Sequence, residues 1–125
     1  MSLYNYIGGE NKLFLDKIGG VFIPVSNIEQ ARDWYCDILD LPTDGEIHFG
    51  HIYVLPLNGQ NIILDSKIFA PEHIHKVPAV QLLTDDIKRS YDYLKQKNVH
   101  ITTEIENGHW FNFEDLDGNI IMVCK

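Results

Sequence analysis

The chain has 125 residues, of which 45 % are hydrophobic and 22 % are charged, a composition typical of one soluble globular domain. Ten Lys and Arg residues stand against 18 Asp and Glu residues, and the formal net charge is −8, so we expect neither a nucleic-acid partner nor a polybasic membrane anchor. No apolar run approaches the ~20 residues of a membrane span, and the N-terminal stretch does not have the pattern of a signal peptide.

The first predicted elements are a strand over 21–25 and a helix that begins at Ser26. Ser26 and Glu29 have the spacing of a capping box, in which each side chain binds the other residue's backbone amide. Pro42 ends the segment, because proline cannot continue a helix. Apolar residues recur at helical spacing in this segment, which indicates that one face of the helix is buried. They are Ile28, Ala31, Tyr35, Ile38 and Leu39.

Three strands are predicted to follow this helix, over 43–49, 51–57 and 60–65. Asn58-Gly59 lies between the last two and is a strong hairpin signal. A tight turn there places Val54 beside Ile63 and Ile52 beside Asp65.

By the same alternation, we expect His51 and Tyr53 to point to the opposite face of the sheet.

The next stretch, 66–78, contains Pro71 and Pro78 and is predicted to be a linker. His73 and His75 lie in it, and we expect both to be exposed polar residues. A second series of elements follows: a strand over 80–83, a helix that begins at Asp85 or Asp86 and has Asn98 as its C-cap, and strands over 100–105, 109–114 and 119–124.

The second series repeats the first at one constant offset. Ser26–Ala31 falls on Asp85–Ser90, and Asn58–Gln60 falls on Asp117–Asn119. The apolar run Ile62–Leu64 then falls on Ile121–Val123 at the same offset. The chain is therefore predicted to contain two copies of one unit, each a strand, a helix and three strands.

This order resembles the glyoxalase, bleomycin-resistance and extradiol-dioxygenase superfamily, also called vicinal oxygen chelate. The stretch from Val25–Glu29 through Trp34–Tyr35 to Leu39–Leu41 is similar to that family's first strand and helix, and Asp115–Asn119 is similar to its last hairpin turn. The resemblance implies an α+β fold in which two βαβββ modules in tandem form a curled mixed sheet around a cleft, with the helices on the outer face. It also implies a homodimer.

The whole chain, 1–125, is then one glyoxalase-like domain. Its parts are an N-terminal extension over 1–18, a first module over 19–65, the linker over 66–78 and a second module over 79–125. Tyr4, Tyr6, Phe14 and Leu15 suggest that the extension docks on the body of the protein or on a partner.

The family's enzymes usually hold one divalent metal ion with His and Glu side chains from four strands. Matching the motifs places these ligands at Gly20, Ile63, Ala79 and Met122. None of these side chains offers the oxygen or imidazole donor that a hard cation needs. We therefore expect no metal and no other cofactor at these positions. A metal site shifted by two residues along each strand would use Phe22, Asp65, Gln81 and Cys124, a mixed donor set.

Strand alternation and the family resemblance predict which side chains face the cleft, and Phe111 and Phe113 are expected to pack under the helices instead. The predicted ligand-binding residues are apolar with a few polar groups, as in small-molecule pockets; an alternative is that they fill a closed core. They are Phe22, Val54, Asp65, Gln81, Leu83, Trp110, Asn112 and Met122.

These residues predict a metal-free protein that binds a small molecule, largely apolar or cationic, in the cleft. The alternative is an enzyme of lyase, isomerase or dioxygenase type that uses a shifted metal site or Asp65 as its acid–base group; otherwise Asp65 lies at a strand end near solvent. A third possibility is a module for dimerisation or regulation with a filled cleft. Two cysteines, Cys36 and Cys124, are too few for a disulfide framework, which favours a cytoplasmic protein.

Overall fold

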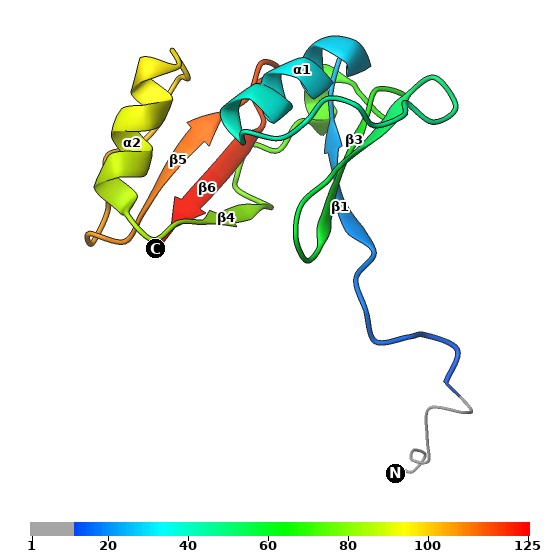
Figure 1. The fold of residues 1–125 in the computed structure, drawn as a ribbon, viewed down its shortest axis with the longest axis horizontal. Coiled ribbons are helices and arrows are strands. Elements are labelled where there is room, and N and C mark those ends of the chain that lie inside the picture. Colours follow the sequence, from blue (N-terminus) through cyan, green and yellow to red (C-terminus); the bar gives the residue numbers. More distant parts are fainter. Residues whose placement is uncertain (1–11) are drawn as a thin grey trace.

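The computed structural model describes residues 12–125 of the chain (Figure 1). Within these residues, two α-helices and six strands follow one another, together with a short 3₁₀ helix, η3. Their bounds are β1 Gly20–Pro24, α1 Ile28–Ile38, β2 Ile52–Leu55, β3 Asn61–Asp65, η3 Pro71–His73, β4 Gln81–Leu83, α2 Ile87–Gln96, β5 Trp110–Glu114 and β6 Ile120–Cys124.

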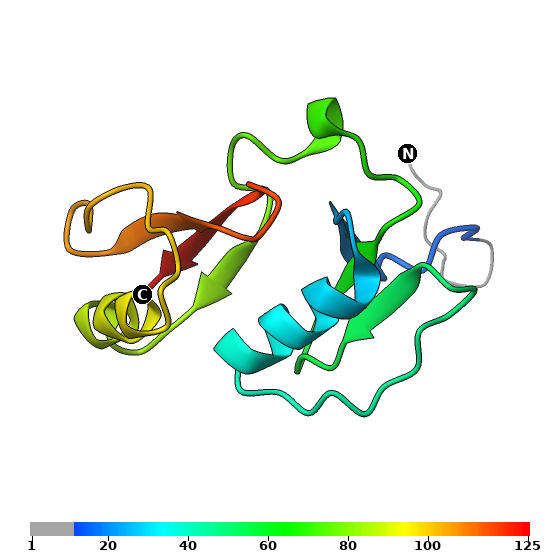
Figure 2. The same cartoon turned by 90° about the horizontal axis from the view of Figure 1, so that it is seen from above.

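The strands form two three-stranded mixed sheets, in the orders β1-β3-β2 and β4-β6-β5. In each sheet the central strand is parallel to the first strand and antiparallel to the other. The two modules lie side by side (Figure 2). The α+β class and the tandem, curled arrangement expected from the sequence are confirmed.

Each helix is capped by the residue directly before it. Asn27, rather than Ser26, is the N-cap of α1, and its Oδ1 accepts from the backbone amide of Gln30 at 2.9 Å. Asp86 caps α2 by accepting from the amide of Arg89 at 3.0 Å. The capping box predicted for Ser26 and Glu29 is therefore wrong by one position, because Asn27 supplies an equally suitable acceptor closer to the first turn.

The strands predicted over 43–49 and 100–105 are absent from the two sheets and leave only isolated bridges, among them His48 with Ile52 and Ile101 with Phe113. The second segment starts regularly, since the amide of Thr102 donates to the carbonyl of Asn112 at 2.8 Å. The amide of Asn112 then donates to the hydroxyl of Thr103 at 2.9 Å. The hydroxyl of Thr103 thus accepts the hydrogen bond that a backbone carbonyl would accept if the strand continued. The strand pairing ends there.

The core lies between the helices and the sheet faces that they cover. Alternate strand residues are buried there, including Tyr53 and Leu64 in the first sheet and Phe111 and Phe113 in the second. Phe111 meets the ring of Tyr91 on α2 edge-on, with centroids 5.2 Å apart. The prediction that Phe111 and Phe113 pack under the helices is confirmed.

The turn Asp115–Asn119 joins the two modules. The side-chain amide of Asn119, which is fully buried, donates to the carbonyl of Pro24 at 2.8 Å and to Oδ2 of Asp115 at 2.9 Å. The hydroxyl of Tyr35 on α1 donates to the same Asp115 oxygen at 2.5 Å. Burial, and then the adjacent Asp115 carboxylate, raise the pKa of Tyr35 well above the ordinary 10.0.

His75 also takes part in this joint, so the prediction that it is simply exposed is wrong. Its backbone amide donates to Oδ1 of Asn119 at 2.8 Å, and its carbonyl accepts from Ile120 at 2.8 Å. The linker therefore lies against the last hairpin, which covers part of the imidazole. His73 is exposed, as expected.

The described part of the N-terminal extension runs away from the body of the protein (Figure 1). Leu13, Phe14 and Leu15 are almost fully exposed, so Phe14 and Leu15 do not dock on their own chain as one alternative predicted. Tyr4 and Tyr6 lie outside the described residues. Within 12–125, no helix is long and apolar enough to cross a membrane.

Candidate functional site

The predicted binding residues of the first module lie on the sheet face opposite α1. Val54 pairs with Ile63 and Ile52 pairs with Asp65, so the register expected from Asn58-Gly59 is confirmed. The parallel partner of Ile63 is Phe22, which places Phe22, Ile63 and Val54 in one row across the three strands.

The second module repeats this row with different chemistry. Gln81 pairs with Met122, which pairs with Asn112, and the amide of Gln81 lies 3.5 Å from the sulfur of Met122. Oδ1 of Asn112 is buried and has no hydrogen-bond partner among the described residues. Trp110 lies beside Cys124 at the end of the same face.

We call these two rows, with Trp110 and Leu83, the open faces of the sheets. Phe22 is 47 % exposed and Leu83 is 81 % exposed, and neither belongs to the buried core. Phe22 and Leu83 therefore do not fill a closed core of the described chain. The open faces carry large apolar side chains that no part of the described chain covers completely, which is unusual for a surface without a binding role.

The residues at the four positions given by the resemblance do not fit a hard divalent cation. A Cβ atom placed on Gly20 would lie 2.7 Å from Cδ1 of Ile63, so Ile63 fills the space that a ligand side chain at position 20 would need. Ala79 has no donor atom, and the thioether of Met122 favours soft metals. Within the described chain, no group of three or more His, Cys, Asp or Glu side chains is placed to hold a metal ion.

Asp65 is not free at a solvent-exposed strand end. It is 4 % exposed, and its Oδ1 accepts from the backbone amide of Lys67 at 2.9 Å and contacts Nδ1 of His51 at 2.8 Å. Asp65 instead belongs to a pair with His51.

The expectation that His51 points away from Asp65 is wrong. Strand β2 begins at Ile52, and the preceding Phe49 and Gly50 both have positive φ, 56° and 81°. A tight turn of this kind lies outside the strand, so the alternation of side chains does not extend to His51. Sequence reasoning could have found the pair only by recognising this turn.

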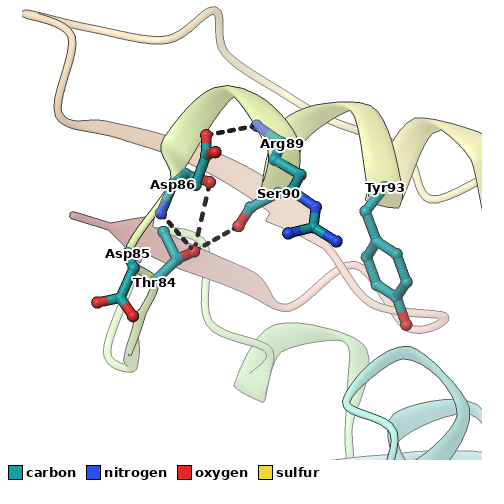
Figure 3. A pocket seen from close by; sticks show the side chains of 6 residues that line it. All are labelled: Thr84, Asp85, Asp86, Arg89, Ser90 and Tyr93. Carbon is teal, nitrogen blue, oxygen red and sulfur yellow. Dashed lines mark hydrogen bonds between the residues drawn. The ribbon is translucent and has the colours of Figure 1, made fainter.

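A hollow of about 380 Å³ lies at the start of α2, where no functional residues were predicted (Figure 3). Some of its polar groups bind one another: the hydroxyls of Thr84 and Ser90 are 2.6 Å apart, and the amide of Asp86 donates to Thr84 at 3.2 Å. Oδ1 of Asp86 accepts from the amide of Arg89 and so caps the first turn of α2. The side chains of Asp85 and Arg89 also line the hollow, and Figure 3 shows no hydrogen bond from the carboxylate or the guanidinium to the other lining residues.

A smaller, apolar hollow of about 150 Å³ lies between the end of α1 and the second sheet. Its lining includes Leu39, Leu82, Tyr93 and Leu83. Of the eight predicted binding residues, only Leu83 lines it. The other seven lie on or beside the open faces rather than in this hollow.

The sequence matches the model of the Glyoxalase/Bleomycin resistance protein/Dioxygenase superfamily over residues 17–123. The chain therefore belongs to this superfamily. A comparison with curated proteins finds no significant match.

Several solved structures share the fold over most of this chain. TnmS3, an antibiotic-binding protein from Streptomyces sp. CB03234, is 21 % identical, with 90 % of this chain and 98 % of that chain covered and a TM-score of 0.71. A superfamily member from Sphaerobacter thermophilus DSM 20745 is 21 % identical, with coverages of 88 % and 97 % and a TM-score of 0.65. A glyoxalase/bleomycin resistance protein from Streptomyces sp. CB03234 is 22 % identical, with coverages of 86 % and 100 % and a TM-score of 0.64.

Proposed function

We propose that this protein binds a small molecule with a large apolar surface, without a metal ion, on the open faces of its sheets. The observation that carries the proposal is the row Phe22, Ile63 and Val54 on the uncovered side of the first sheet, continued by Met122 and its neighbours in the second. Apolar lining with few polar groups is the usual composition of a small-molecule site. The likeness to an antibiotic-binding protein supports the same class of function.

We further infer that the preferred ligand is cationic. The formal charge of −8 raises the local concentration of cations near the surface and disfavours anions. An aromatic cation can also contact the rings of Phe22 and Trp110, whose faces are electron-rich.

Two aromatic ions of similar shape and opposite charge test this function. Tetraphenylphosphonium is expected to raise the melting temperature, and tetraphenylborate is expected to raise it much less. Phe22→Ala should reduce the effect of the cation. Val77→Ala, which shortens a side chain that is 73 % exposed in the linker, is the control and should leave it unchanged.

Equal effects of both ions would contradict the cationic preference. If neither ion binds to the wild-type protein, the proposed function is wrong.

We also propose that the protein is a homodimer in which a second copy covers part of the open faces. The exposed Phe22 and Leu83 support this proposal, because large apolar side chains are usually covered by a partner or a ligand. Sedimentation velocity with Leu83→Glu checks it: the variant should dissociate at concentrations where the wild type remains a dimer. The free thiols Cys36 and Cys124 support the predicted cytoplasmic location.

A further inference from the structure

We propose that His51, held in one tautomer by Asp65, binds a hydroxyl group of an aromatic ligand. The inference rests on the proposed small-molecule function and deepens it, because it names a polar anchor at the edge of the first open face. Asp65 is then a positioning residue, which acts through His51 and not directly on the ligand.

The geometry fixes which nitrogen of His51 is available. Nδ1 lies 2.8 Å from Oδ1 of Asp65, which also accepts from Lys67. A carboxylate oxygen that already accepts a hydrogen bond favours a donor at its second contact, so Nδ1 carries the proton. In the neutral imidazole the lone pair then lies on Nε2, which can accept a hydrogen bond from a ligand.

Nε2 of His51 is also accessible. The side chain of His51 is 24 % exposed and that of Asp65 is 6 % exposed. Nε2 makes no hydrogen bond with the described residues, yet it is not among their buried unsatisfied atoms. The imidazole is therefore held at Nδ1 by Asp65, and Nε2 remains accessible to a ligand.

Asp65 lies on the side of the sheet that was predicted to bind the ligand. Asp65 is in step with Ile63 along β3, whereas the intervening Leu64 is fully buried against the core. Since His51 contacts the carboxylate of Asp65, its ring lies beside the same open face as Ile63.

The second module shows that the fold does not need this pair. The turn Glu106–His109 repeats the backbone hydrogen bonds of the turn His48–His51, with Glu106 and His48 each donating at 2.7 Å to the strand residue opposite. Cys124 takes the place of Asp65 in the second sheet. His109 there binds the carbonyl of Asn107 through Nδ1 at 2.8 Å. The same hairpin forms without a carboxylate, so the pair in the first module is not a structural requirement of the turn.

Phe49 indicates the class of ligand. It adopts φ 56° in the turn, where the second module has Asn107 at φ 52°. A bulky residue in the left-handed region is strained, and such strain is often kept at binding sites. Phe49 is 87 % exposed, and its ring centroid lies 6.5 Å from that of His51. A ligand ring can pack against Phe49 while its hydroxyl donates to Nε2 of His51.

Calorimetry at neutral pH with 4-methylphenol and 4-methylanisole tests the proposal, because both probes are uncharged there and differ only in having a hydroxyl or a methoxy group. Wild-type protein should bind 4-methylphenol more tightly. His51→Gln should weaken 4-methylphenol binding by about fivefold, the usual value of one hydrogen bond, and leave 4-methylanisole unchanged. His109→Gln is the matched control and should change neither.

Equal binding of the two probes, or an unchanged affinity in His51→Gln, would overturn the proposal. If the wild type binds tetraphenylphosphonium but neither 4-methylphenol nor 4-methylanisole, this inference fails and the proposed function stands. If no probe binds, both fail.

Nitrogen-15 spectra of labelled histidine test the role of Asp65 without relying on affinity. At mildly alkaline pH, Nδ1 of His51 in the wild type should carry the proton, and Asp65→Asn should shift His51 toward a tautomer mixture. If Nε2 carries the proton in the wild type, the proposal is wrong, whether or not the variant folds.

Discussion

The side-chain amide of Asn119 donates to the backbone carbonyl of Pro24 at 2.8 Å, although the two residues belong to different modules. The same side chain accepts from the amide of His75 at 2.8 Å and donates to Asp115 at 2.9 Å. One buried residue thus connects β1, the linker and the last hairpin. The two modules are also linked between their helices, where the hydroxyl of Tyr93 donates to the carbonyl of Ile38 at 2.8 Å.

Asn119→Ala is expected to lower the free energy of unfolding by about 3 kcal/mol, because it leaves buried partners on three segments without hydrogen bonds. Urea denaturation measures the change. Asn58→Ala, in the matching turn of the first module, is the control and should cost less than about 1 kcal/mol, since Asn58 is exposed. Similar losses of unfolding free energy in the two variants would show that the hydrogen bonds of Asn119 contribute no more to stability than those of an exposed turn residue.

Tyr35→Phe is expected to change how stability depends on alkaline pH. The pKa of folded Tyr35 is raised well above 10.0 by burial and by Asp115, so the folded chain holds this proton more tightly than the unfolded chain. The resulting stability is complete below the unfolded pKa and is lost as the pH rises beyond it. Denaturation of both proteins from about pH 8 upward should therefore show a gap that narrows above about pH 10. A constant gap would contradict the raised pKa.

The two thiols should react at very different rates. Cys36 is 1 % exposed, and its burial raises the pKa of its thiol above 9.0. Cys124 lies at the end of β6 and is partly exposed. Because the thiolate is the reactive form, iodoacetamide followed by peptide mass spectrometry should find Cys124 labelled first. Fast labelling of Cys36 in the folded protein would contradict the packing of α1 on the first sheet.

Phe49→Asn is expected to stabilise the protein by about 1 kcal/mol, because asparagine tolerates the left-handed backbone better than phenylalanine does. Thermal unfolding measures the gain. The reverse change at the matching position, Asn107→Phe, should lower stability by a similar amount. A loss of stability in Phe49→Asn would mean that the ring of Phe49 stabilises the fold and is not kept for binding.

Local patterns of residues were enough to predict the repeat, the order of the main strands and helices, and the strand register after Asn58-Gly59. These features depend on local signals, namely apolar periodicity and the Asn58-Gly59 pair, whose predicted register is kept although strand pairing stops at Leu55 with Ile62. The sequence also shows that the side chains of Gly20 and Ala79 cannot bind a metal ion, since neither has a donor atom.

The contacts of the polar residues could not be predicted in this way, because they depend on how distant segments pack together. His51 and Asp65 lie 14 positions apart, and their contact depends on a strained turn that removes His51 from strand alternation. The joint at Asn119 connects residues up to 95 positions apart. The packing of the two modules decides whether a polar group such as the Asn119 amide is buried and which group it binds. No local pattern in the sequence contains that information.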